Sequence, residues 1–144
     1  MALQTTISVG LIATLTGAGD IGTPTVPIAY SKAFTWASGV AIDQADMIWT
    51  DQRTLGASAT EDLDFAGVLT SLLGGVLTLA RIKALLVYAA TGNTNNVEVS
   101  RKATTGAPFF MADGDAVSIQ PGGLLLLTCP TAAGYVVTAT TDDM

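Results

Sequence analysis

The stretch SLLGGVLTLARIKALLVYAA, residues 71–90, decides between a helical and an extended fold for this chain. A helix through this region would place one apolar stripe on a single face, made of Leu69, Leu72, Leu73, Val76 and Ala80. Gly74 and Gly75 would then stand inside that helix, at a cost of about 1 kcal/mol each. Gly-Gly is instead a common connection between two hairpin strands. We therefore expect strands on both sides of a turn at residues 71–75.

Beyond this turn, alternation predicts one long strand over residues 76–90 with two distinct faces. One face would hold Ala80, Ile82, Ala84, Leu86 and Tyr88, and the other would hold Leu79, Arg81, Lys83, Leu85 and Val87. Arg81 and Lys83 would point the same way. With Arg101 and Lys102 they are four of the six basic residues. They could form a basic patch for an acidic partner, but we favour ordinary solvation of an exposed face.

The N-terminal segment also favours strands. Residues 5–15 are β-branched and apolar. Pro24 and Pro27 forbid a helix interior over residues 23–30 and favour an extended or edge-strand path. In residues 33–38, Phe34 and Trp36 fall on one side of an alternating run. Trp36 and Trp49 could be core residues or interface anchors, and we favour the core.

Turn residues recur about every 8 to 15 positions through the second half of the chain. The short strands expected between them are VEVS (97–100), AVSI (116–119), LLLLTC (124–129) and YVVTAT (135–140). We expect LLLLTC to be buried on both faces. This spacing is typical of an antiparallel β-sandwich or barrel. The fold class is thus all-β, with residues 1–144 forming a single domain.

Composition restricts the partners of this domain. Charged residues make up 12% of the 144 positions, about half the usual share, which suggests surface hidden against copies of the chain or another protein. The formal net charge of −6 argues against binding nucleic acid or an anionic membrane. The longest uncharged apolar run, residues 65–80, is shorter than the roughly 20 residues of a membrane span.

The sequence GAGDIG, residues 17–22, matches the G-x-G-x-x-G pattern of dinucleotide-binding domains. In that fold the glycines open a helix whose N-terminus holds the pyrophosphate. Here TPTVP follows and cannot form a helix. We therefore interpret GAGDIG as a connection between strands.

Acidic residues gather in the middle of the chain, at Asp43, Asp46, Asp51, Glu61, Asp62 and Asp64. A calcium site and a set of solvated loop acids are both compatible with this cluster, and we favour loop acids, some of them paired with Arg53. Asp113-Gly114-Asp115 comes closest to a calcium loop but lacks the downstream ligands. Paired carboxylates for glycoside hydrolysis would need a cleft and sugar-stacking aromatic residues.

Other catalytic groups are scarce in this sequence. There is no histidine, which removes Ser-His-Asp and Cys-His catalysis and the usual zinc sites. Cys129 has no basic neighbour to lower its pKa and cannot form an intrachain disulfide. Nothing marks Lys83 as a Schiff-base residue. We therefore expect no enzyme, no cofactor and no metal site.

Three segments together resemble a family of small structural proteins of tailed bacteriophages. They are ASGVAIDQADMIWTDQRTLGASATEDLDFAG (37–67), LARIKALLVYAA (79–90) and DAVSIQPGGLLLLTCPTAAGYVVTAT (115–140). The matching residues run from 46 to 67, 79 to 87 and 117 to 138, and the likeness covers roughly residues 36–142. The resemblance implies a jelly-roll-like β-sandwich. Relatives usually continue into further strands, so we expect either a missing terminal strand or pairing supplied by a neighbouring copy.

The resemblance also implies a function in the virion. The first hypothesis is a capsid decoration, or cement, protein on the outer capsid surface, assembled in the bacterial cytoplasm. Its partners would be the major capsid protein and itself, as a homotrimer rather than a homodimer. Residues 1–27 would be an extended arm reaching onto the capsid or a sister subunit. The alternative is a tail, baseplate or fibre-base adaptor. A third class, a sugar-binding module or glycan-degrading enzyme at the fibre tip, would have a cleft with exposed aromatic residues, and burial of both Trp36 and Trp49 would count against it.

Overall fold

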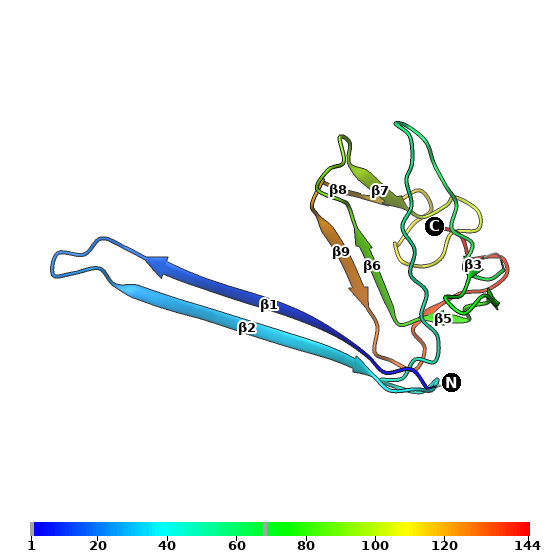
Figure 1. The fold of residues 1–144 in the computed structure, drawn as a ribbon, viewed down its shortest axis with the longest axis horizontal. Coiled ribbons are helices and arrows are strands. Elements are labelled where there is room, and N and C mark those ends of the chain that lie inside the picture. The colour runs from blue at the N-terminus through cyan, green and yellow to red at the C-terminus, as the bar shows by residue number, and fades with distance from the viewer. Residues whose placement is uncertain (1, 68) are drawn as a thin grey trace.

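The computed structural model describes residues 2–67 and 69–144, and in them the chain is all-β with antiparallel strand pairing. Figure 1 shows two parts, a long two-stranded arm and a body built from shorter strands. No helix in the described residues is long and apolar enough to cross a membrane.

The arm is a hairpin of β1 (Thr5–Thr16) and β2 (Thr25–Trp36). Its register is unbroken over all twelve residue pairs, and neither strand pairs with another strand of residues 2–67 and 69–144. The GAGDIG segment forms the tip, as the strand-connection hypothesis predicted. Gly19 is required there, because a Cβ atom would lie 2.8 Å from the carbonyl oxygen of Gly22.

The arm extends past residue 27, which the sequence analysis gave as its end. Residues 2–27 supply β1, the tip and the first residues of β2, while β2 continues to Trp36. The chain therefore runs out along β1 and returns along β2 to the body.

The described part of the body holds four two-stranded antiparallel sheets. They are β3 (Leu69–Thr70) with β4 (Val76–Leu77), β5 (Arg81–Ile82) with β10 (Tyr135–Val136), β6 (Ala84–Tyr88) with β9 (Leu124–Thr128), and β7 (Val97–Ser100) with β8 (Ala116–Ile119). One core cluster, centred on Phe65, Leu69 and Ile82, joins the first two sheets. A second, centred on Ala89, Val99 and Ile119, joins the last two.

The turn predicted at residues 71–75 is confirmed. β3 and β4 pair across residues 71–75, and the Ser71 amide donates to the Gly75 carbonyl at 2.8 Å. The long strand expected over residues 76–90 is wrong, because the chain divides it into β4, β5 and β6.

The expected shared face of Arg81 and Lys83 is also wrong. Arg81 is exposed, whereas Lys83 is buried, and its ammonium donates to the carbonyls of Thr131 and Ala132. Lys83 is thus neither a solvated surface residue nor part of a basic patch. β4, β5 and β6 each pair with a different strand, so the alternation of side chains between two faces does not continue from one of them to the next.

One expectation for the C-terminal half needs correction. β9 was expected to be buried on both faces, but Leu124 is exposed and the rest of the strand is half-buried. The final residues make backbone hydrogen bonds to the body, while a further terminal strand or pairing by a neighbouring copy stays a prediction. The Leu63 and Phe65 amides donate to the carbonyls of Met144 and Asp142, and the Ala107 amide donates to that of Asp143.

Candidate interaction surface

The arm is amphipathic, because its register sorts the side chains of β1 and β2 onto two different faces. Residues directly opposite one another in an antiparallel pair share a face, and alternate residues along each strand do likewise. We call one of these the apolar face; it comprises Thr5, Ile7, Val9, Leu11, Ala13, Leu15, Val26, Ile28, Tyr30, Lys32, Phe34 and Trp36. Nine of these twelve residues are large and apolar.

The opposite face is small and polar. It comprises Thr6, Ser8, Gly10, Ile12, Thr14, Thr16, Thr25, Pro27, Ala29, Ser31, Ala33 and Thr35. The hydroxyls of Thr6 and Thr35 lie 3.3 Å apart across the strands, which agrees with their shared face. Ile12 is the one large apolar side chain among these twelve.

Most of the apolar face is uncovered within one chain. Its exposed large side chains are Val9, Leu11, Leu15, Val26, Ile28 and Tyr30. Figure 1 shows the reason, since the arm projects away from the body along most of its length. An isolated two-stranded ribbon is at best marginally stable in water. A contiguous apolar surface of this kind marks a contact with another molecule.

At its base the arm is anchored to the body. Trp36 is buried and stacks on Phe34 with ring centroids 6.2 Å apart, while the Lys32 ammonium lies 5.7 Å from the centre of the Phe34 ring. An open hollow of about 390 Å³ lies here, lined by residues 32–36 with Asp43 and Pro130. The Asp43 amide donates to the Pro130 carbonyl at 2.9 Å, which fixes the loop behind the hollow.

The expectation that tryptophans belong to the core is confirmed for Trp36. Trp49 is half-buried against the first core cluster, and the Arg53 guanidinium lies 5.9 Å from its ring centre. Burial of both rings would count against a sugar-binding module or glycan-degrading enzyme, and that condition is met for Trp36 alone.

The mid-chain acids do not converge on one site. Arg53 pairs with Asp51 at 3.1 Å and with Glu61 at 3.0 Å, as the loop-acid interpretation predicted. Asp62 instead pairs with Lys102 at 2.7 Å. These contacts tie together the irregular segment of residues 45–63.

The other acidic and basic candidates serve local contacts. Asp113 pairs with Arg101 at 3.1 Å, and Asp115 accepts from the Ala112 amide. Cys129 is half-buried, and its sulfur lies 3.2 Å from the Thr131 hydroxyl.

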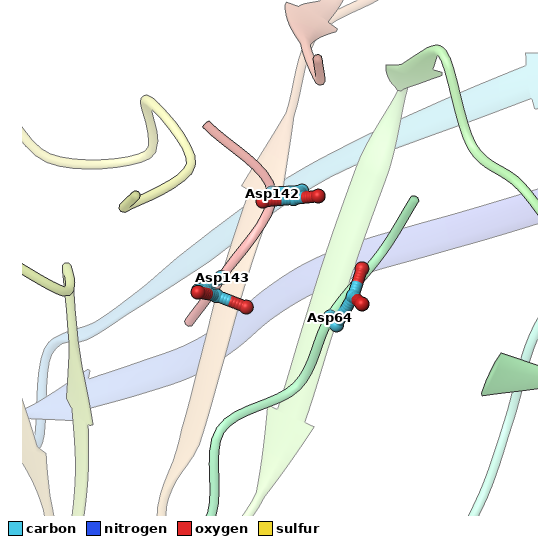
Figure 2. Close-up of side chains that lie close together, drawn as sticks. All are labelled: Asp64, Asp142 and Asp143. Carbon is cyan, nitrogen blue, oxygen red and sulfur yellow. The ribbon is translucent and has the colours of Figure 1, made fainter. Parts of the chain in front are cut away.

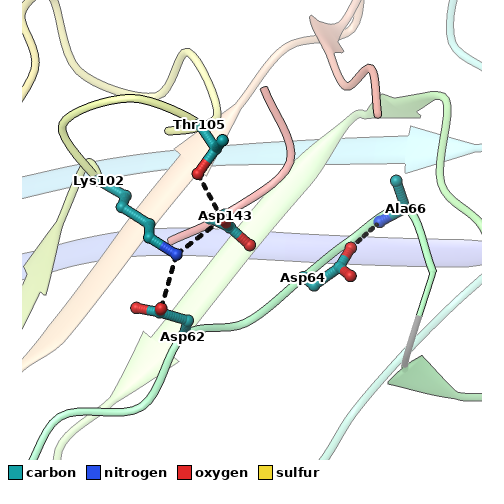
Figure 3. Close-up of polar contacts among 6 residues, drawn as sticks. All are labelled: Asp62, Asp64, Ala66, Lys102, Thr105 and Asp143. Atoms are coloured by element: carbon teal, nitrogen blue, oxygen red, sulfur yellow. Dashed lines mark hydrogen bonds and ion pairs between the residues drawn. The ribbon is translucent and has the colours of Figure 1, made fainter. Parts of the chain in front are cut away.

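A small carboxylate cluster forms where the C-terminal segment crosses residues 63–65. Figure 2 shows the side chains of Asp64, Asp142 and Asp143. Each of the three presents a carboxylate oxygen within 4.8 Å of the others. Figure 3 shows how two of them are satisfied: Asp64 accepts from the Ala66 amide, and Asp143 accepts from Lys102 and Thr105. Such a group could hold a hard cation, but Lys102 already supplies a positive charge.

The two neighbouring C-terminal acids are shifted in opposite directions. Burial, followed by the charges of Asp64 and Asp143, raises the pKa of the Asp142 carboxyl. The Thr105 hydroxyl and the Lys102 ammonium lower the pKa of the Asp143 carboxyl against the effect of burial. A proton on Asp142 would relieve the repulsion within the cluster. We therefore assign the cluster to the internal packing of the C-terminal segment.

Two features were missed from the sequence. Asp142 and Asp143 lie far along the chain from Asp64, so only the fold brings them together. The apolar face could have been found by pairing residues 5–16 with residues 25–36 around GAGDIG, because the paired positions then alternate between large apolar and small polar residues.

No protein-family model, curated protein or solved structure matches this chain.

Proposed function

We propose that this chain is a structural protein of a tailed-phage virion, and specifically a capsid decoration protein that binds the major capsid protein lattice. The observation that carries the proposal is the uncovered apolar face of the arm, which suits a protein whose work is contact with other subunits. The three motifs shared with phage structural proteins supply the setting. On this proposal the protein binds without catalysis or a cofactor.

The loop of residues 45–63 is the surface that we assign to the lattice. It has no regular secondary structure, and Met47, Ile48 and Leu55 are exposed on it. Arg53 braces it through two ion pairs and the Trp49 ring. Exposed loops held by a fixed framework commonly carry binding residues.

The proposed mechanism is linkage. A protein that binds the assembled lattice, and not loose subunits, adds its binding free energy to the stability of the shell. An oligomer that contacts several capsid subunits at once also gains avidity. Decoration would thus oppose the outward pressure of packaged DNA.

The jelly-roll-like sandwich belongs to this proposal. Its support is that the β6–β9 and β7–β8 ribbons share the second core cluster, as two facing layers would. A tail, baseplate or fibre-base adaptor is the alternative function, since such proteins also work through protein contacts.

Copy number separates the two functions. Purified virions should contain this protein in numbers comparable to the major capsid protein, as measured by quantitative mass spectrometry. The purified protein should also co-sediment with expanded capsids that lack it. A handful of copies per particle, with no capsid binding, would favour the tail adaptor and overturn the decoration proposal.

A further inference from the structure

We propose that the apolar face of the arm is covered by the same face of a second copy, with the two arms antiparallel and each tip seated against the base of the other arm. The described arm carries only two charged residues. Asp20 lies at the tip and Lys32 near the base, and neither makes an ion pair within the described part of the chain.

The exposed apolar residues lie between these two charges. Lys32 is opposite Val9 in the register, and Leu15 is opposite Val26. Leu15 is six positions along the chain from Val9, and Asp20 is five positions from Leu15, so the Leu15 level is close to the midpoint. A two-fold axis there would bring Asp20 of each copy level with Lys32 of the other.

The opposite arrangement is disfavoured by charge. Parallel arms, in two or three copies, would place Lys32 beside Lys32 and Asp20 beside Asp20. Like charges brought together cost free energy and select against that alignment. The charge pattern thus favours a two-fold dimer over the homotrimer that the family resemblance suggested.

The hollow at the arm base fits the tip of the partner. Its charged lining residues are Lys32, which lies on the arm beside Phe34, and Asp43, which lies on the loop behind the hollow. The tip offers the Asp20 carboxylate and the fully exposed Ile21 side chain. The Ile21 side chain and the Asp20 carboxylate of the tip thus match the half-buried Phe34 ring and the exposed Lys32 ammonium at the base.

The size of the surface also calls for contact at the tip. Twelve residues of strand span about 40 Å, and two strands with their side chains are about 10 Å wide. Two facing arms then bury on the order of 800 Å² in total, while stable complexes bury about 1,200–2,000 Å². Two tip-to-base contacts bring the total towards that range.

Pro27 obstructs the alternative arrangement, in which a strand of another copy adds to the outer edge of β2. The Gly17 amide donates to the Pro24 carbonyl, so hydrogen-bonded pairs alternate from that point along the ribbon. Thr14 and Pro27 then form a non-hydrogen-bonded pair, and the Pro27 nitrogen faces the outer edge with no hydrogen to donate. The apolar face of the arm, in contrast, has no such obstruction.

Disulfide trapping tests this arrangement on the purified full chain. In a Cys129→Ser background, Asp20→Cys combined with Lys32→Cys should give a covalent dimer upon mild oxidation with copper phenanthroline. The two positions lie roughly 40 Å apart within one arm, so a disulfide between them must join two copies. Peptide mapping should find the mixed 20–32 link.

The single variants Asp20→Cys and Lys32→Cys are the matched controls and should not cross-link efficiently. Efficient cross-linking of either one would show parallel arms and overturn the proposal. A chain that stays monomeric at about 100 μM in sedimentation velocity would show another occupant, such as the capsid, and would also overturn it.

Charge reversal gives a second test that adds no cysteine. Asp20→Lys and Lys32→Asp should each weaken dimerisation by about three- to tenfold, and the two together should restore it. Failure of the double variant to recover would contradict the antiparallel arrangement. This contact needs no capsid, so its failure would leave the decoration proposal standing.

Discussion

Replacing Leu15 by serine should weaken the dimer strongly, because this side chain lies at the proposed two-fold axis. Leu15 is 66% exposed in the single chain. Full burial of a leucine side chain is worth about 1.5–3 kcal/mol, so covering this exposed fraction is worth about 1–2 kcal/mol. Each substitution occurs twice in the dimer. The loss is therefore about 2–4 kcal/mol, or about 30- to 1,000-fold in the dissociation constant.

Sedimentation velocity over a concentration series measures this constant. The matched control is Ile12→Ser, which also removes an exposed apolar side chain from β1. Ile12 is even more exposed, at 88%, but it lies on the small polar face. Its replacement should leave the dissociation constant within about twofold of the parent value, since surface substitutions are usually worth less than 0.5 kcal/mol.

The reasoning is refuted if Ile12→Ser weakens association as much as Leu15→Ser. The dissociation constant would then depend on the hydrophobicity of the removed side chain and not on the face of the arm that carries it. An unchanged constant for Leu15→Ser would remove the arm from the interface. Thermal melting of dilute samples should show both variants folded, since neither side chain packs against the body.

Other substitutions test the body and the tip. Lys83→Met should lower the free energy of unfolding by about 1–3 kcal/mol in urea titrations, because two loop carbonyls lose their buried donor. Asp143→Asn should destabilise the protein near pH 7, and the difference should fade as pH falls below about 4, since a lowered pKa contributes stability only above that range. Asp142→Asn should stabilise the protein near pH 7, and its gain should vanish as pH falls through the raised pKa of Asp142. Gly19→Val should increase amide hydrogen exchange at the arm tip, where its Cβ would meet the Gly22 carbonyl.

The strand content was predictable because local patterns determine it. The Gly74-Gly75 turn, VEVS and AVSI all occur where propensity and turn residues placed them. GAGDIG was correctly separated from the nucleotide-binding pattern because Pro24 forbids the helix which that pattern needs.

Errors arose where a distant segment decides the local structure. Alternation alone placed Lys83 on an exposed face. The carbonyls that accept its ammonium belong to Thr131 and Ala132, which no local pattern connects to it. Likewise, Leu125 of β9 packs against the second core cluster whereas the adjacent Leu124 is exposed, so the apolar run did not require a strand buried on both faces.

Charged residues are scarcest in the N-terminal quarter of the chain, which contains the arm. Residues 1–36 are a quarter of the sequence, yet they hold only Asp20 and Lys32 of its 18 charged residues, the sum of 6 basic and 12 acidic ones. An uncharged apolar ribbon with open edges invites aggregation unless another surface covers it. On our proposal the arms therefore pair in solution before the capsid is met, and the dimer is the form that binds. Two bodies held apart by paired arms could then contact neighbouring capsid subunits at once, which is the geometry that avidity on a lattice requires.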